Sequence, residues 1–406
     1  MTFDDNIRIE TGTPHDYEAV LESFADAMLF DAHVSEPGRQ RYEPDRSLIA
    51  RDDDVVVGTA SAYTRTLSIP GAVVPAAHVT RVAVQSTHRR KGVLSRLMRT
   101  QLRSVPEALC VLWATEPQIY GRFGYGAASW QLEVRAQLHR IGQVSGPRTD
   151  GRLRQVAGKD ALEVLSPIHA AYQQQRPGVS GRDKRDWHKH LDDPSELRHG
   201  LTQRKFVVYS NTAGEATGYA TWRGNLNWDE VGPAGKIVLE ELVATDLEAY
   251  TALWRYVLSM DLAATVSYRH MPVDAPVRHM VSNSRAFESC HRDALWLRIV
   301  KVPEALSQRA YAVPVDLVLE LSDDVIDTNN GRFRLTADSD SATCVPTENP
   351  ADLSMSVKEL GAIYLGGTDP MELAHAGAIE AHTPQAVERA SAAFGWHTAP
   401  CSAEVF

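Results

Sequence analysis

Residues 81–102, with the sequence RVAVQSTHRRKGVLSRLMRTQL, place a strand, a loop with one glycine and an amphipathic helix in direct succession. The β-branched residues at the start predict the strand, and the apolar side chains of the second half recur at helical spacing. Those apolar side chains are Val93, Leu94, Leu97, Met98 and Leu102. A helix that follows a strand so closely buries its apolar face against the sheet that contains the strand. The segment therefore predicts an α/β arrangement.

The loop between this strand and this helix concentrates positive charge. Six basic residues and no acidic residue occur in the segment, although the whole chain has a net charge of −10. A cationic loop with a glycine suits a phosphate at a helix start, because first-turn N–H groups and the helix dipole also attract an anion. The sequence patterns of Walker loops and Rossmann dinucleotide sites are not found in it. A basic, solvated helix start is the alternative, and the local pattern alone does not decide between the two.

The chain is long enough for two or three domains. Strands and helices alternate through the first third, and residues 236–260 repeat the order strand, polar loop, helix. The second loop, TDLE at 245–248, is acidic and would repel a phosphate. We infer a duplicated domain whose second copy has no anion site. The last third has the pattern of a small α+β domain, so the predicted domains are residues 1–150, 151–296 and 297–406.

Composition and charge argue against several classes of protein. The four cysteines are scattered and form no Cys-x-x-Cys pair, which argues against a zinc ribbon or a disulfide framework. No apolar run approaches the roughly 20 residues of a membrane span, and the N-terminus lacks a signal-peptide pattern. We therefore expect a cytoplasmic protein with reduced thiols and no membrane partner. The acidic balance argues against nucleic acid as a partner, and His188-Lys189-His190 is more typical of a polar loop than of a metal site.

The strand VAV and the following HRRKGVLSRLM resemble the pyrophosphate-binding motif of the GCN5-related N-acetyltransferases (GNATs). The usual pattern is Arg/Gln-x-x-Gly-x-Gly/Ala, and this chain has Leu94 in the last position. That departure fits a subfamily, the enhanced-intracellular-survival (Eis) acetyltransferases. IYGRFGYG at 119–126, RDALWLRIVKVPEAL at 292–306 and the terminal Phe406 agree with it. The resemblance implies an α/β and α+β protein: two GNAT domains, the second without a cofactor site, then a sterol-carrier-like domain, assembled as a homohexamer.

The resemblance also implies an activity, which is acetyl-CoA-dependent N-acetyl transfer to amines of polycationic substrates. Transfer would be direct, in a ternary complex and without a metal. Aminoglycosides, whose acetylation gives antibiotic resistance, are the best-known substrates of the family, and lysine side chains or polyamines are alternatives. The expected contacts to acetyl-CoA are Val82, Ala83, Val84, Arg89, Arg90, Lys91, Gly92, Val93, Leu94, Ser95, Thr115 and Glu116. A protein that binds acetyl-CoA or a lipid without catalysis is the alternative function.

Two residues are expected to perform the catalysis. In the family the tyrosine of IYGRFG protonates the departing thiolate, and this tyrosine is Tyr120 here. The alternative role is that of a core aromatic residue, which we expect for Tyr125. The base of the family is the terminal carboxylate, so Phe406 is implicated through its backbone, the alternative being a frayed chain end. Glu404 stands one place before the position where the family has an acidic residue.

Acidic and aromatic groups line the substrate pocket of the family. Phe24, Asp26 and Asp293 match such positions, and paired carboxylates would hold two ammonium groups of one substrate. The alternatives are a core residue for Phe24 and surface charges for the two acids. Arg81 stands where a pocket-lining apolar residue is expected, which would reshape the pocket.

Overall fold

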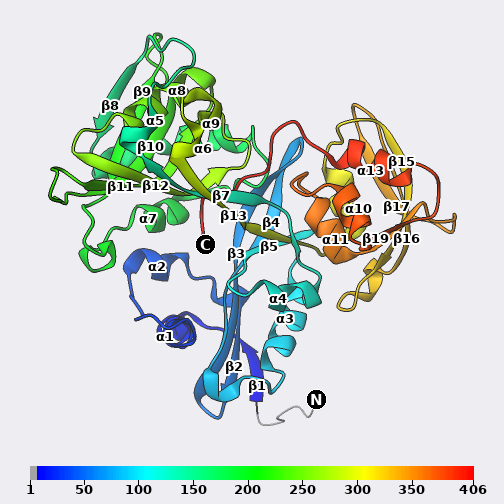
Figure 1. Ribbon diagram of the computed structural model, residues 1–406. Coiled ribbons are helices and arrows are strands. Elements are labelled where there is room, and N and C mark those ends of the chain that lie inside the picture. Colours follow the sequence, from blue (N-terminus) through cyan, green and yellow to red (C-terminus); the bar gives the residue numbers. More distant parts are fainter. Residues whose placement is uncertain (1–6) are drawn as a thin grey trace. The chain divides into compact units, whose positions relative to one another are not determined.

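The computed structural model describes residues 7–406, and these residues form two compact units. The first unit contains the described residues up to Ser129, together with Ala294–His397 and Val405–Phe406. The second unit contains Trp130–Asp293 and Thr398–Glu404. Each unit is therefore assembled from segments that are far apart in the sequence. Figure 1 shows their helices and strands coloured along the chain.

A seven-stranded mixed sheet forms the frame of the first unit. Its strands are, in spatial order, β1 (Ile7–Thr11), β2 (Ser47–Asp52), β3 (Val55–Ile69), β4 (Ala72–Val84), β5 (Leu109–Trp113), β14 (Leu295–Ile299) and β6 (Gly126–Ala127). Neighbouring strands are antiparallel except for β4 and β5, which are parallel. β3 and β4 form the long antiparallel pair drawn in blue in Figure 1.

Two helices cover opposite faces of this sheet. Successive side chains of a strand point to opposite faces, so two adjacent residues identify both sides. Val56 packs with α1 (Tyr17–Ala27), and its neighbour Val57 packs with α3 (Val93–Ser104). The predicted apolar face of α3 is buried, with Val93, Leu97, Met98 and Leu102 in the interior. The shorter helices of this region are α2 (Glu36–Arg41) and α4 (Pro117–Tyr120).

The second unit repeats this arrangement around another seven-stranded sheet. Its strands are, in spatial order, β13 (Phe287–Asp293), β7 (Trp130–Gln137), β12 (Ala263–Pro272), β11 (Gly235–Ala244), β10 (Ala216–Asn225), β9 (Lys205–Ser210) and β8 (Arg152–Val156). Val207 packs with α8 (Leu247–Leu258) on one face, and Val208 packs with α6 (Ala161–Gln173) on the other. β11 and β12 are parallel, as β4 and β5 are. The shorter helices are α5 (Leu138–Ile141), α7 (Lys184–Leu191) and α9 (Val277–Met280).

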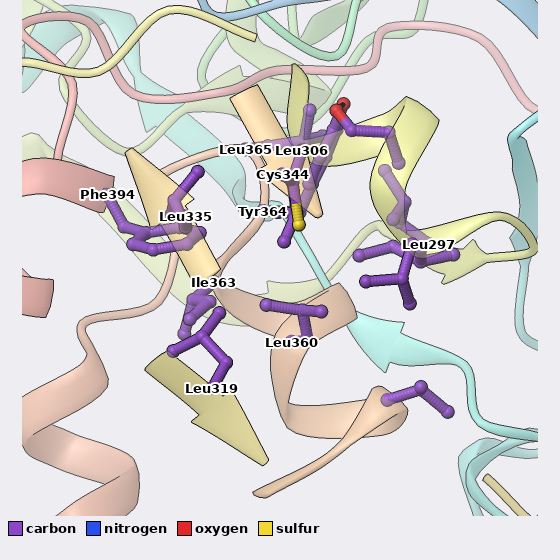
Figure 2. Packing of buried hydrophobic residues seen from close by; sticks show 14 of the residues in the cluster. Leu297, Leu306, Leu319, Leu335, Cys344, Leu360, Ile363, Tyr364, Leu365 and Phe394 are labelled. Carbon is purple, nitrogen blue, oxygen red and sulfur yellow. Dashed lines mark hydrogen bonds between the residues drawn. The ribbon is translucent and has the colours of Figure 1, made fainter. Parts of the chain in front are cut away.

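The C-terminal part of the first unit is an α+β structure with its own five-stranded sheet. The strands are, in spatial order, β17 (Ala342–Pro346), β16 (Gly331–Ala337), β15 (Val315–Ser322), β18 (Leu353–Ser356) and β19 (Ile379–Ala381). The helices are α10 (Val302–Gln308), α11 (Val357–Ile363), α12 (Pro370–His375) and α13 (Ala386–Phe394). Figure 2 shows its core, in which Leu335, Leu360 and Phe394 are buried. Leu297 of β14 belongs to the same core, so this part packs continuously with the first sheet.

The positions of two strands differ from the domain boundaries predicted from the sequence. β7 precedes the boundary at 150/151 but lies in the second sheet, and β14 spans the boundary at 296/297 but lies in the first. The reason is strand pairing, because β7 is hydrogen-bonded between β12 and β13, and β14 between β5 and β6. The boundaries therefore stay a prediction of contiguous domains, whereas each seven-stranded sheet includes a strand from outside the matching predicted domain.

One local expectation is wrong. His188 and His190 lie in α7 rather than in a loop, because Asp183 caps that helix by accepting a hydrogen bond of 2.8 Å from the Asp186 backbone N–H. Within residues 7–406, no group of three or more His, Cys, Asp and Glu side chains is arranged to hold a metal ion. The helices of the described part of the chain are all too short or too polar to cross a membrane.

Candidate active site

β4 and β5 diverge partway along their length. They are paired only at Ala77 and His78, although β4 continues to Val84. On its other side β4 stays paired with β3, with a register shift opposite Thr59–Ser61. Arg81 lies at this bulge with a φ of +48°. Because β5 has moved away, the edge of β4 after His78 offers its backbone groups to a ligand instead of a strand.

A cavity of about 420 Å³ opens where these strands diverge. It is lined by the end of β4, the loop and first turn of α3, and the segment that follows β5. The residues in its wall that were expected to contact acetyl-CoA are Val82, Ala83, Val84, Arg89, Arg90, Gly92, Val93, Leu94, Ser95, Thr115 and Glu116. Tyr120, Ala27 and Met28 also line it, whereas Lys91 does not. The fold thus gathers residues from three separate segments into one place.

The start of α3 forms the basic end of this cavity. Gly92 is the N-cap of α3 and has a φ of +82°, in the left-handed region that glycine adopts without strain. A glycine cap has no side-chain acceptor, which leaves the first-turn N–H groups of this twelve-residue helix available to an anion. The exposed side chains of Arg89 and Arg90 add positive charge there. His88 instead pairs with Asp52 at 3.0 Å, which ties the loop to β2.

Tyr120 ends α4 at the cavity wall and is 6% exposed. Burial, with a smaller contribution from the charge of Glu116, raises the pKa of its phenol to about 12. The hydroxyl therefore keeps its proton at neutral pH and can donate it. Tyr125, in contrast, is fully buried, lies 6.0 Å from Tyr120 between ring centres and is not part of the cavity wall.

The chain ends beside the same strand, β4. Thr80 Oγ1 donates a hydrogen bond of 2.9 Å to the backbone carbonyl oxygen of Phe406. The Phe406 ring packs edge-on against His78 at 4.6 Å, and the Arg65 guanidinium lies 6.0 Å from the ring centre. These contacts give Phe406 partners on β3 and β4. Thr80, which holds Phe406, precedes Val82 of the cavity wall by two residues on β4.

The tail that precedes Phe406 is anchored in the second unit by buried charge. Arg182 donates hydrogen bonds to Glu404 at 2.7 Å and to Glu241 at 2.8 and 3.2 Å. The side chains of Arg182 and Glu241 are 1% and 2% exposed. Although burial opposes it, the charge of Arg182 holds the pKa of Glu241 well below its usual range. Arg176 also donates to the Ala399 carbonyl at 2.7 Å. Glu404 therefore has a fixed partner within the second unit.

The residues expected to bind the substrate fall in different places. Phe24 and Asp26 lie on α1, whose last residue, Ala27, reaches the cavity. Neither of their side chains lines the cavity, since Asp26 is exposed and Phe24 packs edge-on against Phe30 at 5.8 Å. Asp293 lies in β13 of the second unit. Their roles in substrate binding stay predictions.

Arg81 is surrounded by tyrosine rings that sequence reasoning missed. Its guanidinium lies 5.5 Å from the ring centre of Tyr17, 5.7 Å from that of Tyr63 and 6.0 Å from that of Tyr42. Cation–π attraction to three rings stabilises the charge, while Nη1 is buried without a hydrogen-bond partner among residues 7–406. The tyrosines come from α1, β3 and the segment after α2, and no local sequence pattern connects them.

Models of protein families match three parts of the chain. Two acetyltransferase (GNAT) domains match residues 8–128 and 178–299, and a sterol carrier protein domain matches residues 302–403. An uncharacterised N-acetyltransferase of Streptomyces avermitilis is 41% identical over 88% of this chain and 88% of its own length. The N-acetyltransferase Eis of Mycobacterium tuberculosis is 31% identical over 86% of this chain and 87% of its own length.

Solved structures agree with these matches. The crystal structure of Eis1 from Mycobacterium abscessus covers 98% of this chain and 100% of its own, with a TM-score of 0.85 and 30% identity. A GCN5-related N-acetyltransferase from Anabaena variabilis has the same TM-score at 18% identity, over 98% and 100% of the two chains, which supports the fold alone. The predicted fold class of two GNAT domains and a sterol-carrier-like domain is confirmed.

Proposed function

This chain belongs to the Eis family of GNAT N-acetyltransferases, and we propose that it transfers the acetyl group of acetyl-CoA to an amine of a polycationic substrate. The observation that carries the proposal is the cavity between the diverging strands β4 and β5. A basic helix start, a strand edge without a partner strand and a protonated tyrosine meet in its wall. In acetyl transfer from a phosphate-bearing thioester, these elements can bind the phosphates, polarise the carbonyl and protonate the thiolate.

Several parts of the cavity wall have chemistry that suits acetyl-CoA. We assign the pyrophosphate to the N–H groups of residues 90–95, with Arg89 and Arg90 beside them. The backbone of β4 from Val82 to Val84 would hydrogen-bond the pantetheine and polarise the thioester carbonyl. Thr115 and Glu116 would contact the same molecule from the side of β5.

Two proton movements accompany the proposed transfer. The amine nitrogen attacks the acetyl carbonyl carbon, and the carbon–sulfur bond breaks as the carbon–nitrogen bond forms. Tyr120 gives its phenolic proton to the sulfur, and the terminal carboxylate of Phe406 takes a proton from the nitrogen. A terminal carboxyl has an ordinary pKa of about 3.5, so it must act from a desolvated place or through water. Solvent returns the proton to Tyr120 before the next turnover.

Aminoglycosides are the first acceptors to test, with polyamines and lysine side chains as alternatives. A net charge of −10 favours the approach of a polycation. Asp26 and Asp293 are the proposed contacts for its ammonium groups, and Phe24 for its apolar parts. Arg81, held over three tyrosine rings, would keep an ammonium group away from that point of β4. We also propose that the protein assembles as a homohexamer, as the family resemblance implies.

The deciding experiment measures thiol release from acetyl-CoA in the presence of aminoglycosides, polyamines and lysine peptides. Turnover with a multi-amine substrate and not with its fully acylated form supports the proposal. Tight binding of acetyl-CoA without turnover on any amine would contradict the proposal and favour the non-catalytic binding protein. A binding protein needs neither Tyr120 nor a fixed Phe406, so the presence of both residues favours the enzyme.

A further inference from the structure

The second unit contains a cavity at the place that corresponds to the cavity of the first. β11 and β12 are last paired at Leu239 and Tyr268, although β11 continues to Ala244, so these strands diverge as β4 and β5 do. A cavity of about 220 Å³ opens there. Its wall comes from the end of β11, the start of α8 and the end of α6. In the first unit the matching positions are the end of β4, the start of α3 and the end of α1.

The charge at the helix start is reversed between the two cavities. Asp246 is the N-cap of α8, and its Oδ1 accepts a hydrogen bond of 2.7 Å from the Ala249 N–H. The carboxylate of the chain itself therefore takes the place that an anionic ligand would need. Arg176 is the basic residue in the wall, and it donates to both oxygens of Asp274, at 2.8 and 3.2 Å. The charges of Arg176 and Asp274 cancel, so Asp246 gives the cavity a net charge of about −1.

Aromatic rings contribute to the remaining wall beside aliphatic side chains. Tyr172, Tyr250, Trp254 and Tyr268 line the cavity, and the Trp254 ring lies 6.3 Å from that of Tyr250 and 6.2 Å from that of Tyr268. Trp254 and Tyr268 are 1% and 3% exposed, which fixes their rings in the core. Aromatic rings beside a carboxylate attract organic cations, because the ring faces are negative and the carboxylate adds a full charge.

We propose that this cavity is a binding site for a small organic cation with an alkylated ammonium group, and that it is separate from the acetyl-transfer site. The inference rests on the second unit alone and does not depend on the proposed function. The duplicated fold has kept the opening between the two parallel strands and has replaced its phosphate-binding chemistry by a carboxylate and aromatic rings.

Ligand-observed NMR on the full-length protein tests the proposal with choline as the probe. The matched probe is 3,3-dimethylbutan-1-ol, which has nearly the same shape as choline and no charge. We expect choline to bind at least about tenfold more tightly than the alcohol, as expected for a desolvated cation–π site. Equal binding of the two probes, or no detectable binding of choline, would overturn the proposal.

Variants assign the binding to this cavity. Asp246→Asn keeps the helix cap, because asparagine caps as well as aspartate does, and it should weaken choline binding about fivefold or more. Tyr172→Leu removes a ring and should also weaken it. Asp229→Asn, in the loop between β10 and β11, is the control that should leave binding unchanged. Choline binding that survives both Asp246→Asn and Tyr172→Leu belongs to another site, and the proposal is then wrong.

Discussion

Thr80 and the last residue of the chain, Phe406, are joined by a hydrogen bond of 2.9 Å from the threonine hydroxyl to the phenylalanine carbonyl oxygen. Thr80 lies on β4, two residues before Val82 of the cavity wall. One strand therefore holds both the chain end and the edge to which we assign the thioester. In the proposed mechanism one strand would hold both the base and the electrophile, so that mechanism requires a free carboxylate at Phe406.

Extending the chain past Phe406 should abolish catalysis. A Gly-Ser extension turns the terminal carboxylate into a peptide bond, and loss of a general base lowers kcat by about 10² to 10⁴. The measurement is steady-state thiol release, with acetyl-CoA affinity determined separately and expected to be unchanged. The same dipeptide added at the N-terminus is the control. Full turnover by the C-terminally extended protein would remove Phe406 from the mechanism and leave the role of Tyr120 intact.

Tyr120→Phe should lower kcat by about 10² to 10⁴ with little change in KM for acetyl-CoA, because it removes a proton donor and keeps the ring. Tyr125→Phe is the matched control, since its ring centre lies 6.0 Å away and it is not in the cavity wall. Burial raises the pKa of Tyr120 to about 12, so this phenol should not cause a fall in kcat/KM below about pH 11. Equal losses in the two variants would show a packing effect instead.

Arg89→Ala combined with Arg90→Ala should raise KM for acetyl-CoA about tenfold and leave kcat at saturation nearly unchanged. Both side chains stand at the helix start in the cavity wall, where each positive charge attracts the pyrophosphate. Because two positive charges are lost, the KM of the double variant should also depend less on salt concentration. Lys91→Ala is the comparison, because Lys91 does not line the cavity. A larger effect at Lys91 than at both arginines would contradict our placement of the phosphates.

Arg182→Met should destabilise the second unit by about 3 to 5 kcal/mol, because it removes the arginine partner of the buried Glu241 carboxylate and that of Glu404. The Tyr219 hydroxyl, which donates to Glu241 at 2.8 Å, carries no compensating charge. Glu404→Gln should cost only about 1 kcal/mol, since Arg182 keeps its bidentate pair with Glu241. Urea unfolding followed by circular dichroism gives both changes in the free energy of unfolding. If the two variants unfold at the same urea concentration, Glu241 is not the main partner of Arg182.

Acid should destabilise the second unit through His169. This residue is 4% exposed and packs edge-on against Trp187 at 5.6 Å, and burial lowers its pKa to about 3. The unfolded chain, with a histidine pKa of about 6.5, binds the proton more readily. The contribution of neutral His169 to the free energy of unfolding is therefore complete above pH 6.5. It falls by about 1.4 kcal/mol per pH unit as the pH drops from there towards 3.

Thermal unfolding between pH 4 and 7 checks this expectation. His169→Gln should flatten the pH dependence, because glutamine does not titrate. His139→Gln, at an exposed position of α5, should leave it as steep as in the unchanged protein. An unaltered slope in His169→Gln would show that other groups, such as His270, whose pKa burial lowers to about 4, dominate the acid response.

Local patterns predicted the elements of the site well. The apolar spacing of residues 93–102 specifies a helix, and the glycine before it specifies where that helix begins, so the basic end of the cavity could be expected from neighbouring residues. The duplication was visible because both copies repeat the same order of elements. The acidic second loop also fits the structure, where Asp246 caps α8.

Contacts between distant segments could not be predicted in this way. β7 and β14 have ordinary strand patterns, and nothing in them says which sheet each one joins. The pairing of Arg182 with Glu404 and the tyrosines around Arg81 also depend on residues far apart in the chain. Periodicity reports which face of an element is buried and does not identify the surface that covers it.

The placement of β14 has a consequence for how the protein is made. Every other strand of the first sheet occurs before residue 128, yet β14, which begins at Leu295, lies between β5 and β6. A ribosome must therefore synthesise the entire second sheet before the nascent first sheet can close. During that interval the edge of β5 that later pairs with β14 has no partner strand and is open to wrong pairing.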